Sequence, residues 1–351
     1  MYNHDLHVSD EFAEQFPTIK HLLRQEELLR RFDLHDKTAK KNKALFLRLG
    51  IAALLFGFSA LVGIILEIFV PAVGGQLPKW VVVVIETTAI VAIAIVLFDR
   101  FITCSKSHYL LACFARERLR HWQFQMFLDG NLVSMGDHAA QASIINTRLK
   151  NFDQSHQHLQ GSSADYMHRP ASPENLLHPY TPYSDVTVAN EVFAALKTIR
   201  FEHQSQFAKG KGRDAAAPHH IGLSEHYHWS ETFARLSLVG AVSIAVIQLV
   251  LMCLQTKEME TEFHNAHSAL TACALLLVAV SATARAYRTG LTLPEELESY
   301  EDYASHVEML RTRLESADNA RKQELLKELE LEAERELQRF IRMKSKATFL
   351  A

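Results

Sequence analysis

The sequence predicts an all-α integral membrane protein, with four transmembrane helices in two hairpins, cytoplasmic helical extensions and a long C-terminal helix. Apolar residues make up 48% of the 351 residues and are concentrated in a few long blocks. A bilayer core about 30 Å thick needs about 20 such residues for each spanning helix. Between the blocks, apolar residues recur at helical spacing. These two observations exclude a soluble enzyme of comparable length.

The four apolar blocks come in two pairs, and a short turn joins the members of each pair. The first pair is Leu49–Leu66, which extends through Val70, and Trp80–Phe98. The second pair is Leu236–Leu254, which is uncharged, and Ala266–Ala284, which is uncharged and rich in small residues. Each pair is therefore expected to form a transmembrane hairpin.

Basic residues near the ends of these blocks predict the orientation of the chain, because cytoplasmic loops carry an excess of lysine and arginine. Those on the sides away from the hairpin turns are Lys37, Lys40, Lys41, Lys43, Arg48, Arg100, Lys106, Arg235, Arg285 and Arg288. Each turn carries a single lysine, Lys79 or Lys257. We therefore expect a multi-pass protein of the inner (plasma) membrane with both termini and the central segment in the cytoplasm.

These assignments divide the chain into six parts. They are a cytoplasmic N-terminal segment (1–43), the first transmembrane hairpin (44–99), a cytoplasmic helix (100–152), a linker rich in proline and histidine with a short helix (153–220), the second transmembrane hairpin (221–290) and a cytoplasmic C-terminal helix (291–351). The short helix is expected to begin after an Asp185 cap and to end at about Phe207. Residues 209–213, which follow it, indicate a second linker.

In the cytoplasmic helix after the first hairpin, apolar and aromatic residues interleave with arginines. The motif residues of this helix are Arg116, Glu117, Arg118, Arg120 and Trp122. One interpretation is a helix packed on a neighbouring helix or on the membrane surface. The other is a nucleic-acid patch, which would need a wider basic field. The 37 lysine and arginine residues stand against 40 aspartate and glutamate residues, so the balance favours packing and no nucleic-acid partner.

The C-terminal segment predicts a charged helix with a narrow apolar seam. The helix opens at Pro294, and apolar residues recur at spacings of three and four as far as Phe340, with Arg321 interrupting the register. As one helix, residues 295–345 would reach about 75 Å. Such a seam fits coiled-coil or bundle assembly, or a helix folded back on its own chain. The sequence leaves both open.

Two carboxylates inside the predicted spans are the candidates for an ion pathway. Glu67 and Glu86 both lie toward the non-cytoplasmic side of the first hairpin, where an ionisable group is costly and normally faces a bundle interior, water or a partner. One hypothesis is a cation-attracting ring in an oligomeric pore. The alternative is that Glu67 reaches the interface and Glu86 pairs with Lys79 or Thr87. Gln248, also a pathway candidate, is expected to form an interhelical hydrogen bond.

Cysteine and histidine patterns predict no enzyme, metal or cofactor. The cysteines Cys104, Cys113, Cys253 and Cys273 are expected to be packed free thiols in a reducing compartment. The chain has 19 histidines, and pairs such as His156 and His158 invite a metal interpretation. They lack the paired cysteines or the helical spacing of a metal site, and no nucleophile signature is present.

Each hairpin is followed by a helix with its own pattern. Residues 115–124 read ARERLRHWQF after the first. The second is followed by Arg285, Arg288, Gly290, the acidic pair Glu295 and Glu296, Tyr300 and Tyr303. In this arrangement the chain resembles the SLATT-type bacterial membrane effectors, specifically the four-transmembrane branch of SMODS- and SLOG-associating effectors.

The resemblance implies a pore-forming or membrane-disrupting effector of bacterial anti-phage defence that acts on a nucleotide-linked trigger and stops the growth of the infected cell. It also implies a homo-oligomer in membrane lipid. The chain has no recognisable nucleotide-sensor domain, so a separate protein is the expected sensor or source of the nucleotide. Two alternatives remain open: a constitutive ion channel or transporter subunit, and a membrane-anchored scaffold that recruits cytosolic partners through its C-terminal helix.

Overall fold

The computed structural model describes residues 5–72, 75–159, 177–213, 223–254 and 260–347. Within these ranges the elements are helices, and an isolated bridge joins Asp129 to Thr181. The chain divides into two compact units. Unit 1 consists of Met1–Asn42, Ser107–Gly222 and Glu295–Lys346, and unit 2 of Lys43–Lys106, Leu223–Pro294 and Ala347–Ala351.

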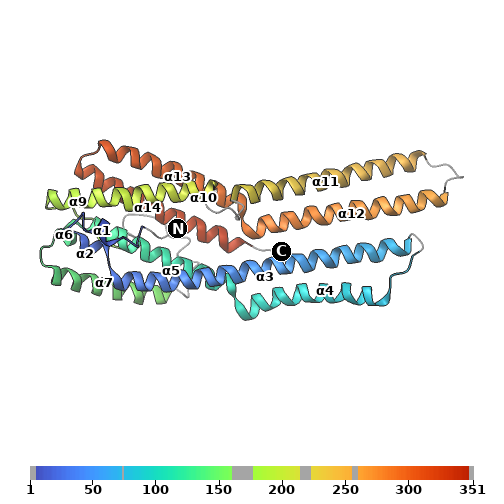
Figure 1. Ribbon diagram of the computed structural model, residues 1–351, viewed down its shortest axis with the longest axis horizontal. Coiled ribbons are helices and arrows are strands. Elements are labelled where there is room, and N and C mark those ends of the chain that lie inside the picture. Colours follow the sequence, from blue (N-terminus) through green and yellow to red (C-terminus); the bar gives the residue numbers. More distant parts are fainter. Residues whose placement is uncertain (1–4, 73–74, 160–176, 214–222, 255–259, 348–351) are drawn as a thin grey trace. The chain divides into compact units, whose positions relative to one another are not determined.

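Unit 2 contains the apolar parts of four helices that are long and apolar enough to cross a membrane, as the sequence predicts. They are α3 (Glu26–Ala72), which begins in unit 1, α4 (Lys79–Phe98), α11 (Leu223–Leu254) and α12 (Glu260–Leu291). The last two run side by side along their length (Figure 1). Length and composition therefore support a multi-pass membrane protein.

Small residues let the helices of unit 2 approach closely. Gly63 of α3 lies directly against Ile85 of α4, so that an added Cβ would collide with the isoleucine side chain. Ile65 packs with Ala272 and Ala279 of α12 in one buried cluster. Close contact between backbones is the usual basis of helix association in membranes.

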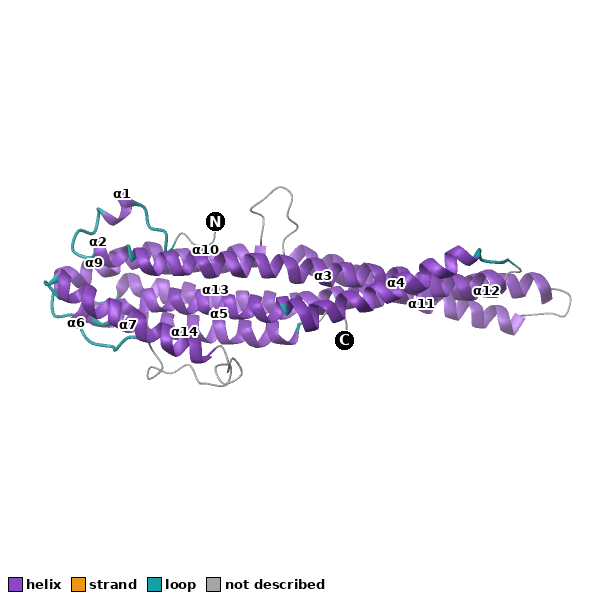
Figure 2. Ribbon diagram, turned by 90° about the horizontal axis from the view of Figure 1, so that it is seen from below, coloured by secondary structure: helices purple, strands orange, loops and turns teal. Residues whose placement is uncertain are grey.

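Unit 1 is a bundle of helices around an apolar core (Figure 2). The longer ones are the start of α3, α5 (Ser105–Gln125), α7 (His138–Leu159), α9 (Val186–Leu196), α10 (His203–Arg213), α13 (Leu293–Ser316) and α14 (Asn319–Lys346). The short ones are α1 (Asp10–Ala13), α2 (Lys20–Leu23) and α6 (Gly130–Val133). Phe32, Phe127 and Val307, from three separate segments, are fully buried in the core. The three segments of the unit thus share one core.

The predicted single helix over residues 100–152 is wrong. A π-helical stretch, Asp99–Thr103, ends at Cys104, which has a left-handed backbone (φ 44°), before α5 begins. The Asp99 carboxylate accepts a hydrogen bond from the Ser105 backbone N–H (3.3 Å), which accounts for the new start. Past α5, Gly130 lies against the backbone of Pro182, where a side chain would not fit. The segment is therefore divided among α5, α6, α7 and their connections.

The predicted linker over residues 153–220 contains more helix than expected. The Asp185 cap is confirmed, since its carboxylate accepts a hydrogen bond from the Thr187 N–H (2.7 Å). From there α9 continues through the π-helical stretch Lys197–Glu202 into α10, so residues 209–213 are helical and form no linker. The apolar face of this region is buried in unit 1, which favours continuation of the helix. Residues 160–176 and 214–222 lie outside the described ranges.

The C-terminal segment is two helices, not one. The break falls between α13 and α14, where the Asp318 carboxylate accepts a hydrogen bond from the Arg321 backbone N–H (2.8 Å) and caps α14. Leu314 and Leu325, on either side of the break, are buried in the core of unit 1. The seam therefore pairs within the chain, and the coiled-coil interpretation is wrong.

The cysteines are free thiols, as the sequence predicts, but most of them are not buried as expected. All four cysteines are free. Only Cys113 is buried, whereas Cys253 and Cys273 lie exposed on helices of unit 2 and Cys104 is half-buried. Cys253 and Cys273 lie on two of the candidate spans. The outer surface of a span is in contact with lipid in a membrane, so an exposed thiol there is not exposed to water.

Candidate functional site

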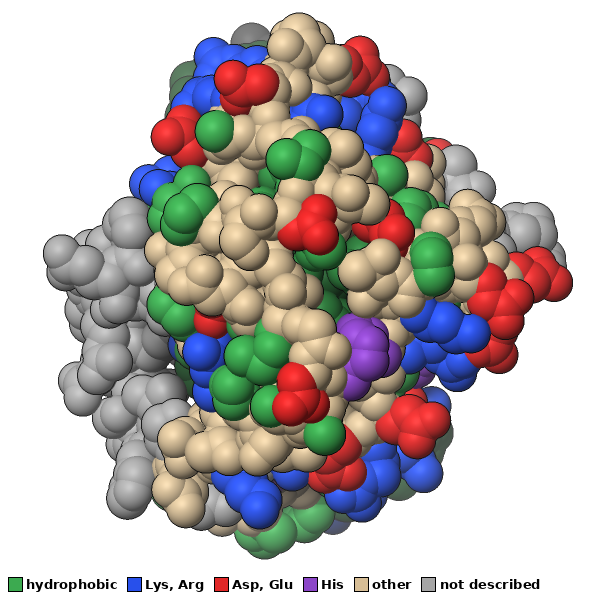
Figure 3. Space-filling view, turned by 90° about the vertical axis from the view of Figure 1, so that its left-hand side faces the viewer, with side chains coloured by type: hydrophobic (Ala, Val, Ile, Leu, Met, Phe, Trp, Pro, Cys, Tyr) green, Lys and Arg blue, Asp and Glu red, His purple; other side chains and the backbone are tan. Residues whose placement is uncertain are grey.

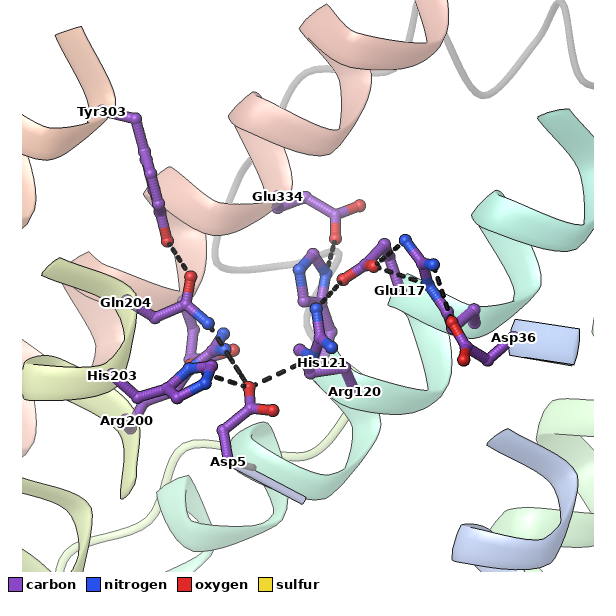
Figure 4. Close-up of polar contacts among 12 residues, drawn as sticks. Asp5, Asp36, Glu117, Arg120, His121, Arg200, His203, Gln204, Tyr303 and Glu334 are labelled. Atoms are coloured by element: carbon purple, nitrogen blue, oxygen red, sulfur yellow. Dashed lines mark hydrogen bonds and ion pairs between the residues drawn. The ribbon is translucent and has the colours of Figure 1, made fainter. Parts of the chain in front are cut away.

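Helix α5 places a group of charged side chains inside unit 1 (Figure 4). The predicted motif residues Arg118, Arg120 and Trp122 are all less than one-tenth exposed. Buried charges are stable only when they are paired and hydrogen-bonded. Carboxylates from other segments of the chain supply those partners.

The first part of this buried ionic cluster surrounds Glu117. Arg116 donates to Asp36 of α3 (Nη1–Oδ1 2.9 Å) and to Glu117 (Nε–Oε1 2.9 Å). Arg120 donates to the other oxygen of Glu117 (2.6 Å). Burial opposes the charged form of Glu117, but Arg120 and Arg116 outweigh it and lower the pKa of this carboxyl to about 2. Glu117 is therefore a carboxylate at neutral pH.

The second part surrounds Asp5. This carboxylate lies 3.1 Å from Nε of Arg120 and 3.8 Å from Nη1 of Arg200. Arg200 donates from Nε to Glu330 of α14 (2.7 Å) and its guanidinium lies over the ring of Phe124, 4.3 Å from the centroid. Asp5, Arg200 and Glu330 are each at most 1% exposed. Three distant segments of the chain thus meet at these charges.

The third part joins α5 to α14 through Glu334. Arg118 donates from Nη1 to both oxygens of Glu334 (2.8 and 2.9 Å), and Nδ1 of His121 lies 2.9 Å from the same carboxylate. Beside it, the ring of Trp122 meets His178 edge-on with centroids 4.7 Å apart. Burial, followed by the charge of Arg148, lowers the pKa of His178 to about 3, so this imidazole is neutral.

A cavity of about 100 Å³, open on one side, borders the cluster. Its charged and polar lining residues include Arg116, Glu117, Arg120, His121, Arg200 and Glu336. Tyr300 and Tyr303 of the second predicted motif also line it, and the Tyr303 hydroxyl donates to Gln204 (3.1 Å). Burial raises the pKa of Glu336 to about 7, and Ser299 donates hydrogen bonds to its carboxyl oxygens (3.0 and 2.8 Å).

Arg285, Arg288 and Gly290 of the second motif lie in unit 2, whereas Glu295 and Glu296 lie in unit 1. Arg285 is exposed, Gly290 is buried, and Arg288 lies over the ring of Tyr227, 5.7 Å from its centroid. This pattern therefore does not form one site, because only Tyr300 and Tyr303 reach the cavity.

The two intramembrane carboxylates lie on exposed helix faces of unit 2. Glu67 and Glu86 are both exposed, and within the described ranges neither has a hydrogen bond or ion pair. The Thr87 hydroxyl donates instead to the Val83 carbonyl (2.7 Å). The expected pairing of Glu86 with Lys79 or Thr87 is therefore not seen.

Gln248 forms the interhelical hydrogen bond that the sequence predicts. Its amide group donates to the Thr271 hydroxyl (2.7 Å) and to the His267 carbonyl (3.0 Å), which joins α11 to α12. These bonds give Gln248 a structural role whether or not it also borders an ion pathway.

Sequence reasoning missed the partners of the α5 motif and the buried pair beside them. Asp5, Asp36 and Glu334 pair with arginines of α5, and Arg200 pairs with Glu330. One signal was available on α14, where Leu326, Glu330 and Glu334 follow one another at a spacing of four. Acidic residues in line with a buried leucine indicate carboxylates that face the core.

The expectations of no metal and no nucleic-acid partner stay predictions. Among the described residues, no three histidine, cysteine, aspartate or glutamate side chains are placed to hold a metal ion, and His156 and His158 lie outside the described side chains. The arginines of α5 are taken up by internal ion pairs. On the face of unit 1 in Figure 3, acidic and basic side chains are interspersed and no broad basic patch is present.

Comparisons of the chain with protein-family models, curated proteins and solved structures find no match. The function therefore has to be inferred from the residues of the chain itself. Two features qualify as functional: the unpaired carboxylates of unit 2, and the buried ionic cluster of unit 1 with its cavity.

Proposed function

We propose that the chain is a multi-pass effector of the bacterial inner membrane that oligomerises and permeabilises this membrane in anti-phage defence. The observation that carries the proposal is the exposure of Glu67 and Glu86 on apolar helices, without a partner among the described residues. A charged side chain in hydrocarbon costs about 2.5–3.5 kcal/mol on insertion scales. Contact with other copies around a water-filled path would remove that cost.

The depth of the two carboxylates is compatible with one ring of charge. At a rise of 1.5 Å per residue, Glu67 lies about 8 Å from the end of α3 at Ala72, and Glu86 lies about 11 Å from the start of α4 at Lys79. Carboxylates from several copies would then gather near the same end of the hairpins. Rings of acidic side chains select for cations.

The composition of unit 1 supports a topology with both ends of the chain on one side. Its three segments, Met1–Asn42, Ser107–Gly222 and Glu295–Lys346, belong to one compact unit although a hairpin separates each from the next. Segments that share a core occupy the same side of a membrane. The distribution of lysine and arginine favours the cytoplasm as that side.

A trigger acting on unit 1 has a direct route to the spans. Helix α3 runs without interruption from Glu26, in unit 1, to Ala72, in unit 2. In this proposal, a rearrangement at its start reaches the first span along one continuous helix. The resemblance to SLATT-type effectors supports a nucleotide-linked trigger that a separate protein senses or synthesises.

The alternative function as a scaffold is less well supported. It depends on an exposed apolar seam of the C-terminal helix that cytosolic partners could bind. Leu325, Leu329 and Leu337 of the expected docking seam are buried against the chain's own core. A constitutive channel would use the same carboxylates but needs no trigger, so the two are separated by the dependence of flux on a stimulus.

The test combines cells and purified protein. Membrane potential and growth are followed after induced expression, and cation flux is measured in liposomes that contain the purified chain. We expect depolarisation and growth arrest with the wild type. The double variant Glu67→Gln with Glu86→Gln should lower cation flux several-fold, because it removes the attraction for cations but keeps side-chain size.

The matched control is Ser243→Ala, which also changes an exposed polar side chain in a span but removes no charge. It should leave flux unchanged. Native mass spectrometry checks that both variants keep the oligomer size of the wild type. If the double variant conducts as the wild type does, Glu67 and Glu86 are not part of the pathway.

A further inference from the structure

Arg200 is a charge of the buried ionic cluster with a donor that lacks a hydrogen-bond partner among the described residues. It is 1% exposed and lines the cavity. Its Nε donates to Glu330, whereas its Nη1 lies 3.8 Å from Asp5 and its Nη2 has no hydrogen-bond partner. A buried donor without an acceptor is destabilising, and more so when the group is charged. A ligand oxygen in the cavity would remove that cost.

The Nη2 donor of Arg200 favours an anion as the source of that oxygen. Arg116 and Arg120 also border the cavity, but Asp36, Glu117 and Asp5 already pair with them. Guanidinium groups bind the planar or tetrahedral oxygens of carboxylates and phosphates through paired N–H donors.

Apolar side chains also line the cavity. Phe207 and Tyr300 meet edge-on there, with ring centroids 5.9 Å apart, and Leu337 and Phe340 are further lining residues. A cavity of about 150 Å³ is needed to enclose benzene. The space here is about 100 Å³, so it would hold the head group of a ligand, and a ring against Phe207 and Tyr300 would reach past it.

We propose that this cavity binds a small organic anion, with a carboxylate or phosphate head held by Arg200 and an apolar body against Phe207 and Tyr300. The inference does not rest on the proposed membrane activity. Both head groups present the oxygens that Arg200 lacks, and the two are told apart by direct comparison of matched ligands.

Isothermal titration calorimetry on the full chain in detergent micelles tests the proposal. The probes are benzoate and phenyl phosphate, with benzyl alcohol as the neutral analogue of similar size and inorganic phosphate as the head group alone. We expect both aromatic anions to bind, and benzyl alcohol to bind at least about tenfold more weakly because it lacks the charge. The tighter of the two anions identifies the head group.

Two variants locate the site. Arg200→Lys keeps the buried positive charge but loses the paired donors, and should weaken both anions about tenfold. Phe207→Leu should weaken the aromatic anions and spare inorganic phosphate. The control Arg148→Lys alters another partly buried arginine, paired with Asp129 away from the cavity, and should change nothing.

Binding of neither aromatic anion, or equal binding of benzyl alcohol, would overturn the proposal and leave water as the occupant of the cavity. Binding that survives both Arg200→Lys and Phe207→Leu would also overturn it. If Arg200→Lys does not fold, as judged by its circular dichroism, Phe207→Leu still decides. None of these measurements involves flux, so failure here leaves the proposed membrane activity standing.

Discussion

Units 1 and 2 place their charged residues in opposite environments. In unit 1, Arg200 and Glu330 are buried 2.7 Å apart, and further ion pairs tie α5 to the N-terminal segment and to α14. In unit 2, Glu67 and Glu86 lie on exposed helix faces, with no partner among the described residues. The same type of side chain is satisfied within the chain in one unit and open to the surroundings in the other.

This difference separates two kinds of constraint. The pairs of unit 1 fix how distant segments pack, because each charge is satisfied only when its partner's helix is in place. The carboxylates of unit 2 have to be solvated or paired by groups outside the described part of the chain. Charge in unit 1 therefore ties distant segments of the chain together, whereas Glu67 and Glu86 in unit 2 are left exposed.

If the buried ion pairs hold unit 1 together, removal of one partner should destabilise the folded chain. Glu330→Leu leaves Arg200 buried without its close carboxylate, and we expect the free energy of unfolding to fall by about 3–5 kcal/mol. Denaturant titration of the detergent-solubilised chain, followed by circular dichroism, measures the change. A variant as stable as the wild type would contradict this account.

The matched control replaces both partners, Arg200→Met with Glu330→Leu. Because apolar replacement of a whole buried pair is often neutral, most of the lost stability should return. Asp5 keeps Arg120 as a partner at 3.1 Å in this double variant. A double variant that loses as much as Glu330→Leu alone would show that the loss came from packing and not from the unpaired charge.

The membrane part of the fold could be predicted because hydropathy is a property of about 20 consecutive residues and needs no knowledge of partners. The four candidate spans follow from it. The break at Asp318 could not be predicted in the same way. A continuous seam and a folded-back seam have the same apolar spacing, and only the burial of Leu325 in the chain's own core distinguishes them.

One part of the candidate site, the charged run of α5, could be predicted from the sequence. The basic run at residues 116–120 stood out, but its partners did not, because Arg118 and Glu334 are 216 positions apart. Tyr300 and Tyr303 were identified through a resemblance that gave no reason for them to lie beside α5. One sequence carries no information on which distant charges meet, so the cavity could not be predicted.

Glu336 is the exception in unit 1, because burial and not an ion pair dominates the pKa of its carboxyl group. Burial raises the pKa of this carboxyl from 4.5 to about 7 in the folded chain, and Ser299 and Arg339 only partly offset it. Its contribution to stability is complete below pH 4.5 and is lost as the pH rises through about 7. By pH 8 the loss amounts to about 3 kcal/mol.

The measurement compares the wild type with Glu336→Gln at pH 5 and pH 8. The variant cannot ionise and can still accept a hydrogen bond from Ser299, so its advantage in unfolding free energy should grow by about 2.5 kcal/mol between these values. The exposed Glu298→Gln on the neighbouring helix α13 serves as the control for removal of one negative charge. An advantage that is independent of pH would show that Glu336 is ionised throughout.

The neutral polar side chain of Gln248 forms hydrogen bonds within unit 2, in contrast to the carboxylates of Glu67 and Glu86. Its replacement is expected to have the smallest effect on stability. Gln248→Leu removes the hydrogen bonds to Thr271 and His267 but keeps an apolar side chain of similar size. Thr271 retains its own bond to the His267 carbonyl (2.8 Å), so no new donor is left unpaired. We expect a loss of about 0.6 kcal/mol in the detergent-solubilised chain, the average for interhelical hydrogen bonds in membranes, and unchanged cation flux. A changed flux with unchanged stability would instead place Gln248 beside Glu67 and Glu86 on the ion pathway, and the division between the two kinds of polar residue in unit 2 would fail.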